Sequence, residues 1–522
     1  MRDTALSSSA SDCEMAHTDR PPARDLLDAA TLRQIGLSAA TLHRTPPVYQ
    51  HIFRALERAV ASGALQPGSR LPAERQLAVA LKVSRATVVK AYRELEARGL
   101  ARGYVGRGTF VSAAPDSSGA PFAWRGKLAA AALRTADTVI LDLVRDASDP
   151  ALISAGGGVP ALEKFPADAF RRSLDRVLRR DGHRVWGHGA TEGLPALREA
   201  VAGRYGGQPD NVLILAGAQQ GLDLLARCLV DPGDTVVIDR PGYLGAIHTF
   251  RAAGARLVGW DVVRHDLDEL EDLLVRYRPK LIYTNPTFQN PTGWTMPIRL
   301  RRDVLELAGR LRVPIIEDDT YRELSFGAEL PPTLHSLDTQ SVVIHLSSFS
   351  KVLAPGLRLG WLSAAEPIVE QLALIKQRAD PHAPNLTQSI VADMMDDGTF
   401  DKHVIELCLE HRRRRDALAA ALERHGAAGN LQWTRPDGGL YLWCRLPPRV
   451  NSATVTARAL ADSVSVVHGQ PFYADRAGDR ELRLCFSGVP IGRADDLARR
   501  LLRAIALVRR ESGAPPALVA IV

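Results

Sequence analysis

The spacing of apolar residues divides the chain into two parts. From residue 47 the positions Val48, Ile52 and Leu56 recur at helical spacing, which predicts an amphipathic helix. The segment GALQPGSRLP then breaks this pattern with glycine and proline. Two further helices are predicted after it, a short one over residues 73–81 and a longer one over 84–99.

Two short strands around a glycine-rich turn are predicted over residues 100–112, LARGYVGRGTFVS. In the helix before them, Ser84 suits the N-cap and Gly99 suits the position just past the C-terminus. A helix, a short helix, a turn, a helix and a β-wing, in this order, are the layout of a winged helix–turn–helix domain.

Beyond residue 124, apolar segments alternate with helical patterns for about 250 residues. This alternation predicts an α/β domain with a mostly parallel sheet. From about Ala383 long helices and a few strands predict a smaller α+β lobe. The predicted strands are 211–215, 235–239, 256–260, 280–284, 314–318, 342–348 and 358–364.

These patterns and the composition between them give the expected domains. An N-terminal extension without a clear pattern comes first, with one short helix near its end, and the winged helix–turn–helix domain follows. A linker containing AAPDSSGAP then leads to one large domain and a C-terminal tail. The expected segments are 1–43, 44–112, 113–124, 125–510 and 511–522.

The positive charge of the chain is concentrated in residues 44–112. This segment contains twelve Lys or Arg and four Asp or Glu, so it alone exceeds the net charge of +7 of the whole chain. Such an excess is expected of a domain that binds a polyanion. A solvated basic surface would give the same count, so charge alone leaves both interpretations open.

The remaining composition is that of an ordinary soluble protein, with 46% hydrophobic and 24% charged residues. The five cysteines are scattered and no pair is spaced C-x-x-C, so neither disulfides nor a metal site is expected. The sequence shows neither the apolar core of a signal peptide nor an apolar run of membrane-spanning length. We therefore expect a cytoplasmic protein with no membrane partner.

The helix predicted over 84–99 carries candidate DNA-reading residues. Ser84, Arg85, Thr87 and Lys90 cluster at its start and along one face. A recognition helix presents its N-terminal residues to base edges in the major groove, where arginine can pair with guanine through two hydrogen bonds. We expect these four residues to contact double-stranded DNA.

Three further residues, Arg75, Arg107 and Thr109, are better placed for DNA phosphates. Residues 48–100 resemble the GntR-type winged helix along their whole length, including PGSRLPAERQLA and VSRATV, and GRGTFV fits its wing. The resemblance implies binding to an operator. A protein-interaction module is the alternative, because winged helices are sometimes used in that way.

The large domain contains segments suited to a Schiff-base cofactor with a phosphate group. In SSFSKVLAPGLRLGW, residues 347–361, a lysine just beyond a buried strand is followed by an arginine seven residues later. The lysine could form the imine, and the arginine with nearby hydroxyls could hold the phosphate. GAQQG, residues 217–221, opens a helix whose N–H groups could also take a phosphate.

Three more segments complete the pattern. NPTG, residues 290–293, offers an amide to a phenolic oxygen, and EDDTY, residues 317–321, places an acid where it could keep a pyridine nitrogen protonated. RLCFSG, residues 483–488, offers an arginine for a carboxylate. Each segment alone is weak, because it could be a turn, a solvated acid or a surface residue. Their order and separations give the pattern its weight.

Together these segments resemble the fold-type-I aminotransferase class I/II family, which uses pyridoxal 5′-phosphate, over about residues 125–510. The resemblance implies that Lys351 carries the cofactor as a Schiff base and shuttles protons. It also implies that Asp318 pairs with the pyridine nitrogen, that Asn290 and Tyr321 bond the ring oxygen, and that Tyr243 stacks on the ring.

The same resemblance assigns the phosphate and the substrate. The phosphate would be held by Ala218, Gln219, Ser348 and Arg358, and the carboxylate of an amino acid by Arg483.

Two positions leave a question open. Asp319 lies beside Asp318 and could take its role, although the three-residue spacing to Tyr321 favours Asp318. Trp186 stands where the family usually has a tyrosine that reaches the phosphate of the neighbouring subunit. Tryptophan can stack and donate from its indole but has no phenol, so this contact across the subunits is in doubt.

A GntR-type reader followed by an aminotransferase-like domain is the architecture of MocR-like transcription regulators. In that family the cofactor domain typically senses a vitamer or amino acid and alters DNA binding. We therefore expect a homodimeric DNA-binding regulator that responds to a small amino compound. A working aminotransferase for an amino acid and a 2-oxo acid, with an appended DNA-binding domain, stays open. A scaffold that has lost its cofactor is a further alternative. The presence of Lys351, Asp318 and Arg358, the residues that the cofactor needs, argues against it.

Overall fold

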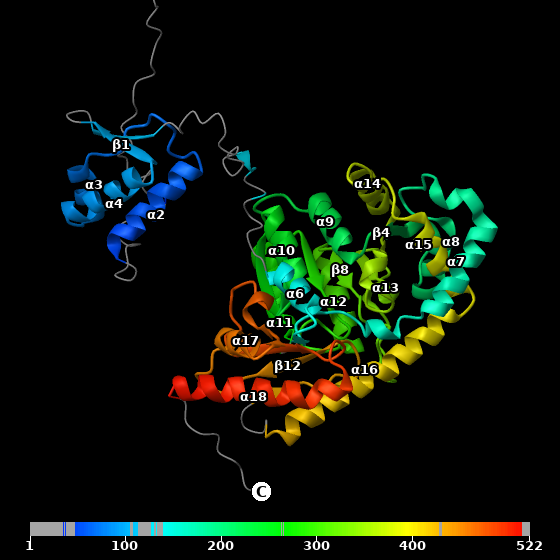
Figure 1. The fold of residues 1–522 in the computed structure, drawn as a ribbon. Helices are drawn as coiled ribbons and strands as arrows, with labels where there is room; N and C mark the ends of the chain where they lie inside the picture. The colour runs from blue at the N-terminus through cyan, green and yellow to red at the C-terminus, as the bar shows by residue number, and fades with distance from the viewer. Residues whose placement is uncertain are drawn as a thin grey trace, which may run out of the picture. The chain divides into compact units, whose positions relative to one another are not determined.

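The computed structural model of the chain separates into two compact units, Met1–Ala130 and Ala131–Val522 (Figure 1). It describes residues 35, 37, 47–104, 108–112, 127–129, 132, 139–262, 264, 266–426 and 431–513. The expected linker, Arg107, the short helix near residue 26 and most of the N-terminal extension lie outside these residues.

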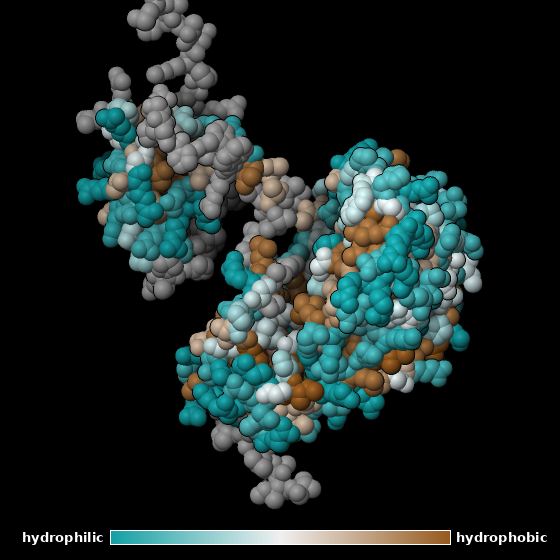
Figure 2. Space-filling model, turned by 45° about the vertical axis from the view of Figure 1, so that its right-hand side comes forward, coloured by the Kyte–Doolittle hydropathy of each residue, from teal (hydrophilic) through white to brown (hydrophobic). Residues whose placement is uncertain are grey.

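The smaller unit has the order of elements that the sequence predicts. Its hydrophobic core joins all three helices and both strands, and Ser84 caps its last helix by accepting a hydrogen bond from the backbone N–H of Thr87 at 3.2 Å. Most of the coloured residues of this unit that are visible in Figure 2 are hydrophilic. The elements are α2 (Val48–Ala61), α3 (Glu74–Leu81), α4 (Arg85–Ala97), β1 (Ala101–Tyr104) and β2 (Gly108–Val111).

The larger unit is built on a seven-stranded sheet of order β4-β10-β9-β8-β7-β5-β6. All seven predicted strands form, and only β10 runs antiparallel to its neighbours. The prediction of a mostly parallel sheet is therefore confirmed. The strands are β4 (Val212–Leu215), β5 (Thr235–Arg240), β6 (Arg256–Asp261), β7 (Leu281–Thr284), β8 (Ile315–Asp318), β9 (Val343–Ser348) and β10 (Gly360–Ser363).

Helices cover both faces of this sheet because alternate strand residues point to opposite faces. Val236 and Ile238 pack with α9, α10 and α14, whereas Val237 packs with α11, α12 and α13. The helices are α9 (Ala218–Leu229), α10 (Leu244–Ala253), α11 (Leu267–Tyr277), α12 (Ile298–Leu311), α13 (Leu334–Leu337) and α14 (Glu366–Gln377).

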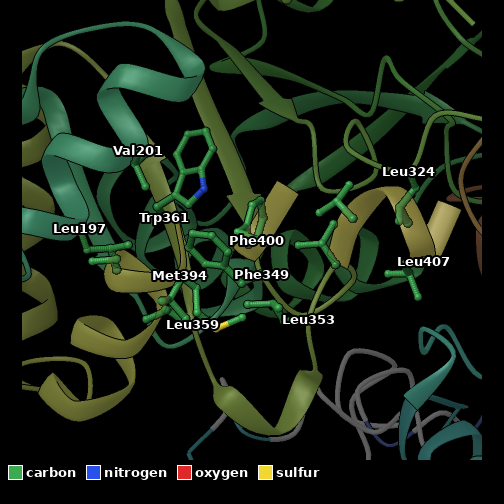
Figure 3. Close-up of a cluster of buried hydrophobic side chains, with 14 of the residues drawn as sticks. Leu197, Val201, Leu324, Phe349, Leu353, Leu359, Trp361, Met394, Phe400 and Leu407 are labelled. Atoms are coloured by element: carbon green, nitrogen blue, oxygen red, sulfur yellow. The ribbon is translucent and has the colours of Figure 1, made fainter. Parts of the chain in front are cut away.

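A further core lies beside the β4 edge of the sheet. There Trp361 and Phe349 pack with Leu197 and Val201 of α8 and with Phe400 of α16 (Figure 3). The elements around it are α7 (Ala167–Asp181), α8 (Pro195–Tyr205), α15 (Asn385–Asp396) and α16 (Thr399–Arg424).

The smaller lobe has its own four-stranded sheet, of order β11-β12-β15-β14, with α16 and α18 packed against each other beside it (Figure 1). The sequence did not predict that β3, from far earlier in the chain, pairs in parallel with β13 of this lobe. The elements are α6 (Val139–Ser148), β3 (Ile153–Ser154), β11 (Gln432–Trp433), β12 (Tyr441–Arg445), α17 (Ser452–Ala461), β13 (Val464–Ser465), β14 (Val467–His468), β15 (Glu481–Cys485) and α18 (Ala494–Glu511).

Across the described ranges, no helix is long and apolar enough to cross a membrane.

A fully buried ion pair joins α12 to the centre of the large sheet. The guanidinium of Arg301 lies 3.5 Å from the carboxylate of Glu317 on β8, and it donates hydrogen bonds to the carbonyl oxygens of Pro286, Met296 and Pro332. Glu317 accepts two backbone N–H bonds from the start of α13. Because both charges are fully bonded, the pair can be accommodated without water.

We expect Arg301→Met to destabilise the larger unit by about 3–5 kcal/mol, because it leaves a buried carboxylate without its counter-charge. Arg310→Met, on the same helix, removes an exposed ion pair with Glu271 and should cost less than about 1 kcal/mol. Urea unfolding followed by tryptophan fluorescence measures both costs, since all seven tryptophans lie beyond residue 112. Equal costs for the two variants would show that the buried pair does not stabilise the fold.

Candidate functional site

One edge of the large sheet gathers most of the predicted cofactor residues. Parallel strands end at the same edge, and the residues after β4, β5, β8 and β9 line one cavity of about 180 Å³ there. Because β10 runs antiparallel, Arg358, two residues before its start, lies at this edge too. The predicted residues that line the cavity are Ala218, Gln219, Tyr243, Asp318, Tyr321, Ser348, Lys351 and Arg358.

The first end of the cavity is built to hold an anion. The N-terminus of α9 opens into it, where the first backbone N–H groups of a helix have no partner within the helix. Gly217 precedes this helix with φ of +102°, a conformation that favours glycine. Arg358 reaches the same place and donates to the carbonyl oxygen of Ala216 at 2.6 Å. The hydroxyl of Ser348 lies 3.0 Å from that of Ser350.

Close backbone packing fixes this end of the cavity. A Cβ atom at Gly360 would lie 2.9 Å from backbone atoms of Gly217 and Ala218, which is closer than real contacts allow. Glycine at position 360 therefore lets β10 approach the start of α9, and it sets the spacing between Arg358 and the helix N-terminus.

Asp318, at the end of β8, is the acid that faces the cavity. Its carboxylate accepts hydrogen bonds from the hydroxyls of Tyr283 at 2.7 Å and Thr320 at 2.6 Å. Burial raises the pKa of Asp318. Asp319 does not line the cavity; its carboxylate lies 3.6 Å from the imidazole of His345. Of the two acids, Asp318 is therefore the one that lines the cavity.

The amine of Lys351 lies in the same cavity and donates to the carbonyl oxygen of Gly158 at 2.6 Å. Burial lowers the pKa of this amine to about 8, and the guanidinium of Arg483 acts in the same direction. With a pKa near 8, about one-tenth of the amine is neutral at pH 7, far more than for an ordinary lysine, so it can act as a nucleophile or base.

A chain of polar contacts connects the large sheet to the smaller lobe. Tyr441 and Tyr321 have hydroxyl oxygens 3.1 Å apart, and Asn290 donates to Tyr321 at 3.2 Å. Arg483, on β15, donates to Asn290 at 3.0 Å and to the carbonyl oxygen of Gly156 at 2.6 Å. These groups line a second cavity of about 380 Å³ that adjoins the first through Lys351 and Tyr321.

Pyridoxal phosphate fits the two adjoining cavities. The anion end of the first cavity offers the N–H groups of α9 and the guanidinium of Arg358, and its middle offers Asp318 and Lys351. The far end, in the second cavity, offers a hydrogen-bond donor. There the Nε of Arg483 is buried and has no hydrogen-bond partner in the described part of the chain. The donor set therefore suits a phosphate, a protonated ring nitrogen and a carboxylate.

The side chains of the predicted residues Gln219 and Tyr243 are bonded to each other. The Gln219 side chain donates to Thr249 at 2.7 Å and accepts a hydrogen bond from Tyr243 at 3.4 Å, so only its backbone N–H is available at the start of α9. Sequence reasoning missed Tyr441, Tyr283, Asn285 and Gly158. The repeated Asn-Pro of TNPTFQNPTG is a signal that could have identified Asn285.

In the smaller unit, the predicted DNA-reading residues meet on the first turns of α4. Arg85 is exposed but already bonded to the carboxylate of Glu74, at 3.0 and 2.8 Å. The Lys90 amine lies 4.1 Å from the ring centroid of Tyr49. Arg75 on α3 is exposed, and Thr109 on β2 is half-buried.

Trp186, which stands at the position expected to meet a neighbouring subunit, is 68% exposed. It follows α7 in a short helical turn, Gly182–Trp186. Tryptophan is highly buried on average in folded proteins, so Trp186 is among the more exposed tryptophans.

Comparisons with known proteins agree with both units. Residues 159–501 match the family described as aminotransferase class I and II, and residues 48–111 match the bacterial regulatory proteins of the gntR family. The solved structure of LysN, an alpha-aminoadipate aminotransferase from Thermus thermophilus, is similar with a TM-score of 0.70 and 35% identity, over 74% of this chain and 99% of that one.

Two relatives share both parts. The chain is 30% identical to the uncharacterized HTH-type transcriptional regulator YdfD of Bacillus subtilis, over 83% of this chain and 91% of that protein. It is also 30% identical to the probable rhizopine catabolism regulatory protein MocR of Rhizobium meliloti, over 80% and 83% of the two chains. The chain therefore belongs to the aminotransferase class I and II family, whose cofactor is pyridoxal phosphate, and its GntR-type DNA-binding domain makes it a transcription regulator of the MocR-like kind.

Proposed function

We propose that this regulator senses a small amino compound, such as an amino acid or vitamer, in its cofactor site and changes its affinity for an operator in response. The observation that carries the proposal is the Nε of Arg483, which has no hydrogen-bond partner among the described residues and lies in a cavity that also holds the Lys351 amine. A ligand with a primary amine and a carboxylate can react at the Lys351 end of this cavity and bind Arg483 at the other end.

Pyridoxal phosphate supplies a carbonyl that condenses with primary amines and a ring that withdraws electrons from them. The backbone N–H groups of Ala218 and Gln219 hold its phosphate, together with Ser348 and Arg358. This assignment is supported by the convergence of these four residues at the anion end of the cavity.

The ring end of the cofactor is oriented by other residues. Asp318 binds the ring nitrogen, Asn290 and Tyr321 bind the ring oxygen, and Tyr243 stacks on the ring. The hydrogen bonds from Tyr283 and Thr320 keep the Asp318 carboxylate in place. Lys351 would hold the cofactor covalently when no ligand is present, and its amine would then move a proton at the carbon next to the ligand's amine.

We propose that α4 reads DNA in the major groove through Ser84, Arg85, Thr87 and Lys90, while Arg75, Arg107 and Thr109 contact phosphates. Arg85 must leave Glu74 to reach a base. Since their ion pair is largely exposed, its loss costs little, and a contact with two hydrogen bonds to guanine outweighs it.

We also propose a cytoplasmic homodimer. The exposed indole of Trp186 supports a two-fold interface at this surface, and a symmetric pair of readers fits paired half-sites in an operator.

A second candidate function is a working aminotransferase, because the groups that transfer an amino group are all present. Lys351 with its lowered pKa, Asp318, Tyr321 and Arg483 line the two adjoining cavities. Steady-state turnover with an amino acid and a 2-oxo acid distinguishes it from a sensor, which shows at most a single turnover.

The protein without cofactor should attach pyridoxal phosphate faster as pH rises, up to about pH 8, and no faster above it. Burial lowers the pKa of Lys351 to about 8, and only the neutral amine is a nucleophile. Stopped-flow visible absorbance at saturating cofactor measures this rate. Lys351→Ala is the control and should show no covalent absorbance. A rate that keeps rising to pH 10 would contradict a lowered pKa.

Arg85→Ala should weaken binding to the cognate operator about tenfold or more, because one good base contact contributes about 1–3 kcal/mol of discrimination. Arg98→Ala is a matched control: Arg98 follows the other end of α4, and it is similarly exposed and paired with Glu57. Gel shifts with DNA flanking the protein's own gene measure both affinities. If both variants bind as wild type does, α4 is not the recognition helix.

L-Alanine and ethylamine provide a matched pair of ligands for the sensor site, because they differ chiefly in the carboxylate. We expect L-alanine to displace Lys351 from the cofactor and to change operator affinity more strongly than ethylamine, by a coupling of about 1–3 kcal/mol. Arg483→Gln should remove the difference between the two ligands. Visible spectra and gel shifts are followed together. Equal responses to both ligands in the wild type would exclude the sensing role of Arg483.

A further inference from the structure

A separate cavity of about 720 Å³ lies between the ends of β5 and β6 and the smaller lobe's β12 and β15. It shares no lining residue with the two cavities of the cofactor site. Its volume falls within the range of sites for small organic ligands, about 300–1,000 Å³. None of the roles proposed above uses it.

Two indoles line this cavity. Trp294 follows the NPTG turn, and Trp443 lies on β12; both are half-buried. Trp443 packs edge-on against Phe472, with ring centroids 5.6 Å apart, and Phe472 also lies against Arg483 of the cofactor site, 4.9 Å from its guanidinium carbon. The Phe472 ring is therefore in contact with residues of both sites. The part of the Trp443 indole that is not buried offers a flat apolar surface on which an aromatic ring can stack.

The charges around the cavity favour an anion. Its described lining includes four arginines, whereas Asp261 and Glu481 are its only described acids. Three of the arginines lie within ion-pair distance of aspartates, but Arg445 has no side-chain hydrogen bond or ion pair to any described residue. Arg445 sits opposite Glu481 in the β12–β15 ladder, yet the two charges do not come within ion-pair distance. Its guanidinium is thus available to a ligand.

We propose that this cavity is a second ligand site, which binds a small planar aromatic anion by stacking on Trp443 and by an ion pair with Arg445. Both residues stand on one face of β12, two positions apart, so a single ligand can touch both. The aromatic ring of the ligand stacks on the indole, and its carboxylate forms charge-assisted hydrogen bonds with the guanidinium of Arg445.

Naphthoate is the probe, titrated calorimetrically into the full-length protein loaded with pyridoxal phosphate. We expect saturable binding. Decahydronaphthoate, which lacks the aromatic system, and naphthylmethanol, which lacks the charge, should each bind at least about fivefold more weakly. The absence of saturable naphthoate binding, or equal affinity for all three compounds, would overturn the proposal.

Substitutions in and around the cavity show where the ligand binds. Arg445→Gln should weaken naphthoate about tenfold and leave naphthylmethanol unchanged, whereas Arg413→Gln, an exposed arginine on α16, should leave both unchanged. Trp443→Phe should keep binding and Trp443→Leu should lose it, with the visible cofactor spectrum showing that each variant is folded. Naphthoate binding that survives Arg445→Gln but is lost in Arg483→Gln would mean that the probe occupies the cofactor site, and the proposal would be wrong.

Discussion

The alternation of side chains at the end of β8 connects the stability of the larger unit to its chemistry. Glu317 points to one face of the sheet, where it pairs with the buried guanidinium of Arg301 and caps the start of α13. Asp318, the next residue, points to the other side and lines the cofactor cavity. The same strand therefore carries a buried charge that must stay paired and an acid that must face the ligand. A shift of one residue in its register would exchange the two, so the ion pair also fixes which acid serves the site.

Arg483 connects the ligand cavity to both lobes of the larger unit. This residue belongs to the smaller lobe, and its hydrogen bonds reach Asn290 on the large-sheet side and Gly156 just after β3. In the sensing role proposed above, a ligand carboxylate that engages the guanidinium competes with or adds to these bonds, and so favours one arrangement of the two lobes. A ligand can shift such an equilibrium only by its differential affinity for the two arrangements. The ring of Phe472 against Arg483 brings a second cavity within reach of the same residue.

Much of this protein follows from local sequence patterns. Helical spacing, glycine and proline breaks and the Ser84 cap predicted the winged helix, and all seven strands of the large sheet were predicted from short apolar runs. The cofactor segments were predicted from their residue types, their order and separations, and their resemblance to the aminotransferase family. Lys351, Asp318, Ser348 and Arg358 lie together in the structure because residues that follow different parallel strands converge at one edge of the sheet.

Other features depend on contacts between residues far apart in the chain. Arg483 bonds Gly156 across 327 positions, and the hydroxyl of Tyr441 meets that of Tyr321 across 120. No local period predicts such pairs, because they form only when segments far apart in the chain pack together. The choice of Asp318 over Asp319 and the pairing of Arg85 with Glu74 were likewise decided in three dimensions. The sequence by itself determined the elements and the edge at which the chemistry gathers. The tertiary structure decided which side chains point into the cavity, since orientation depends on packing between elements rather than on the pattern within one.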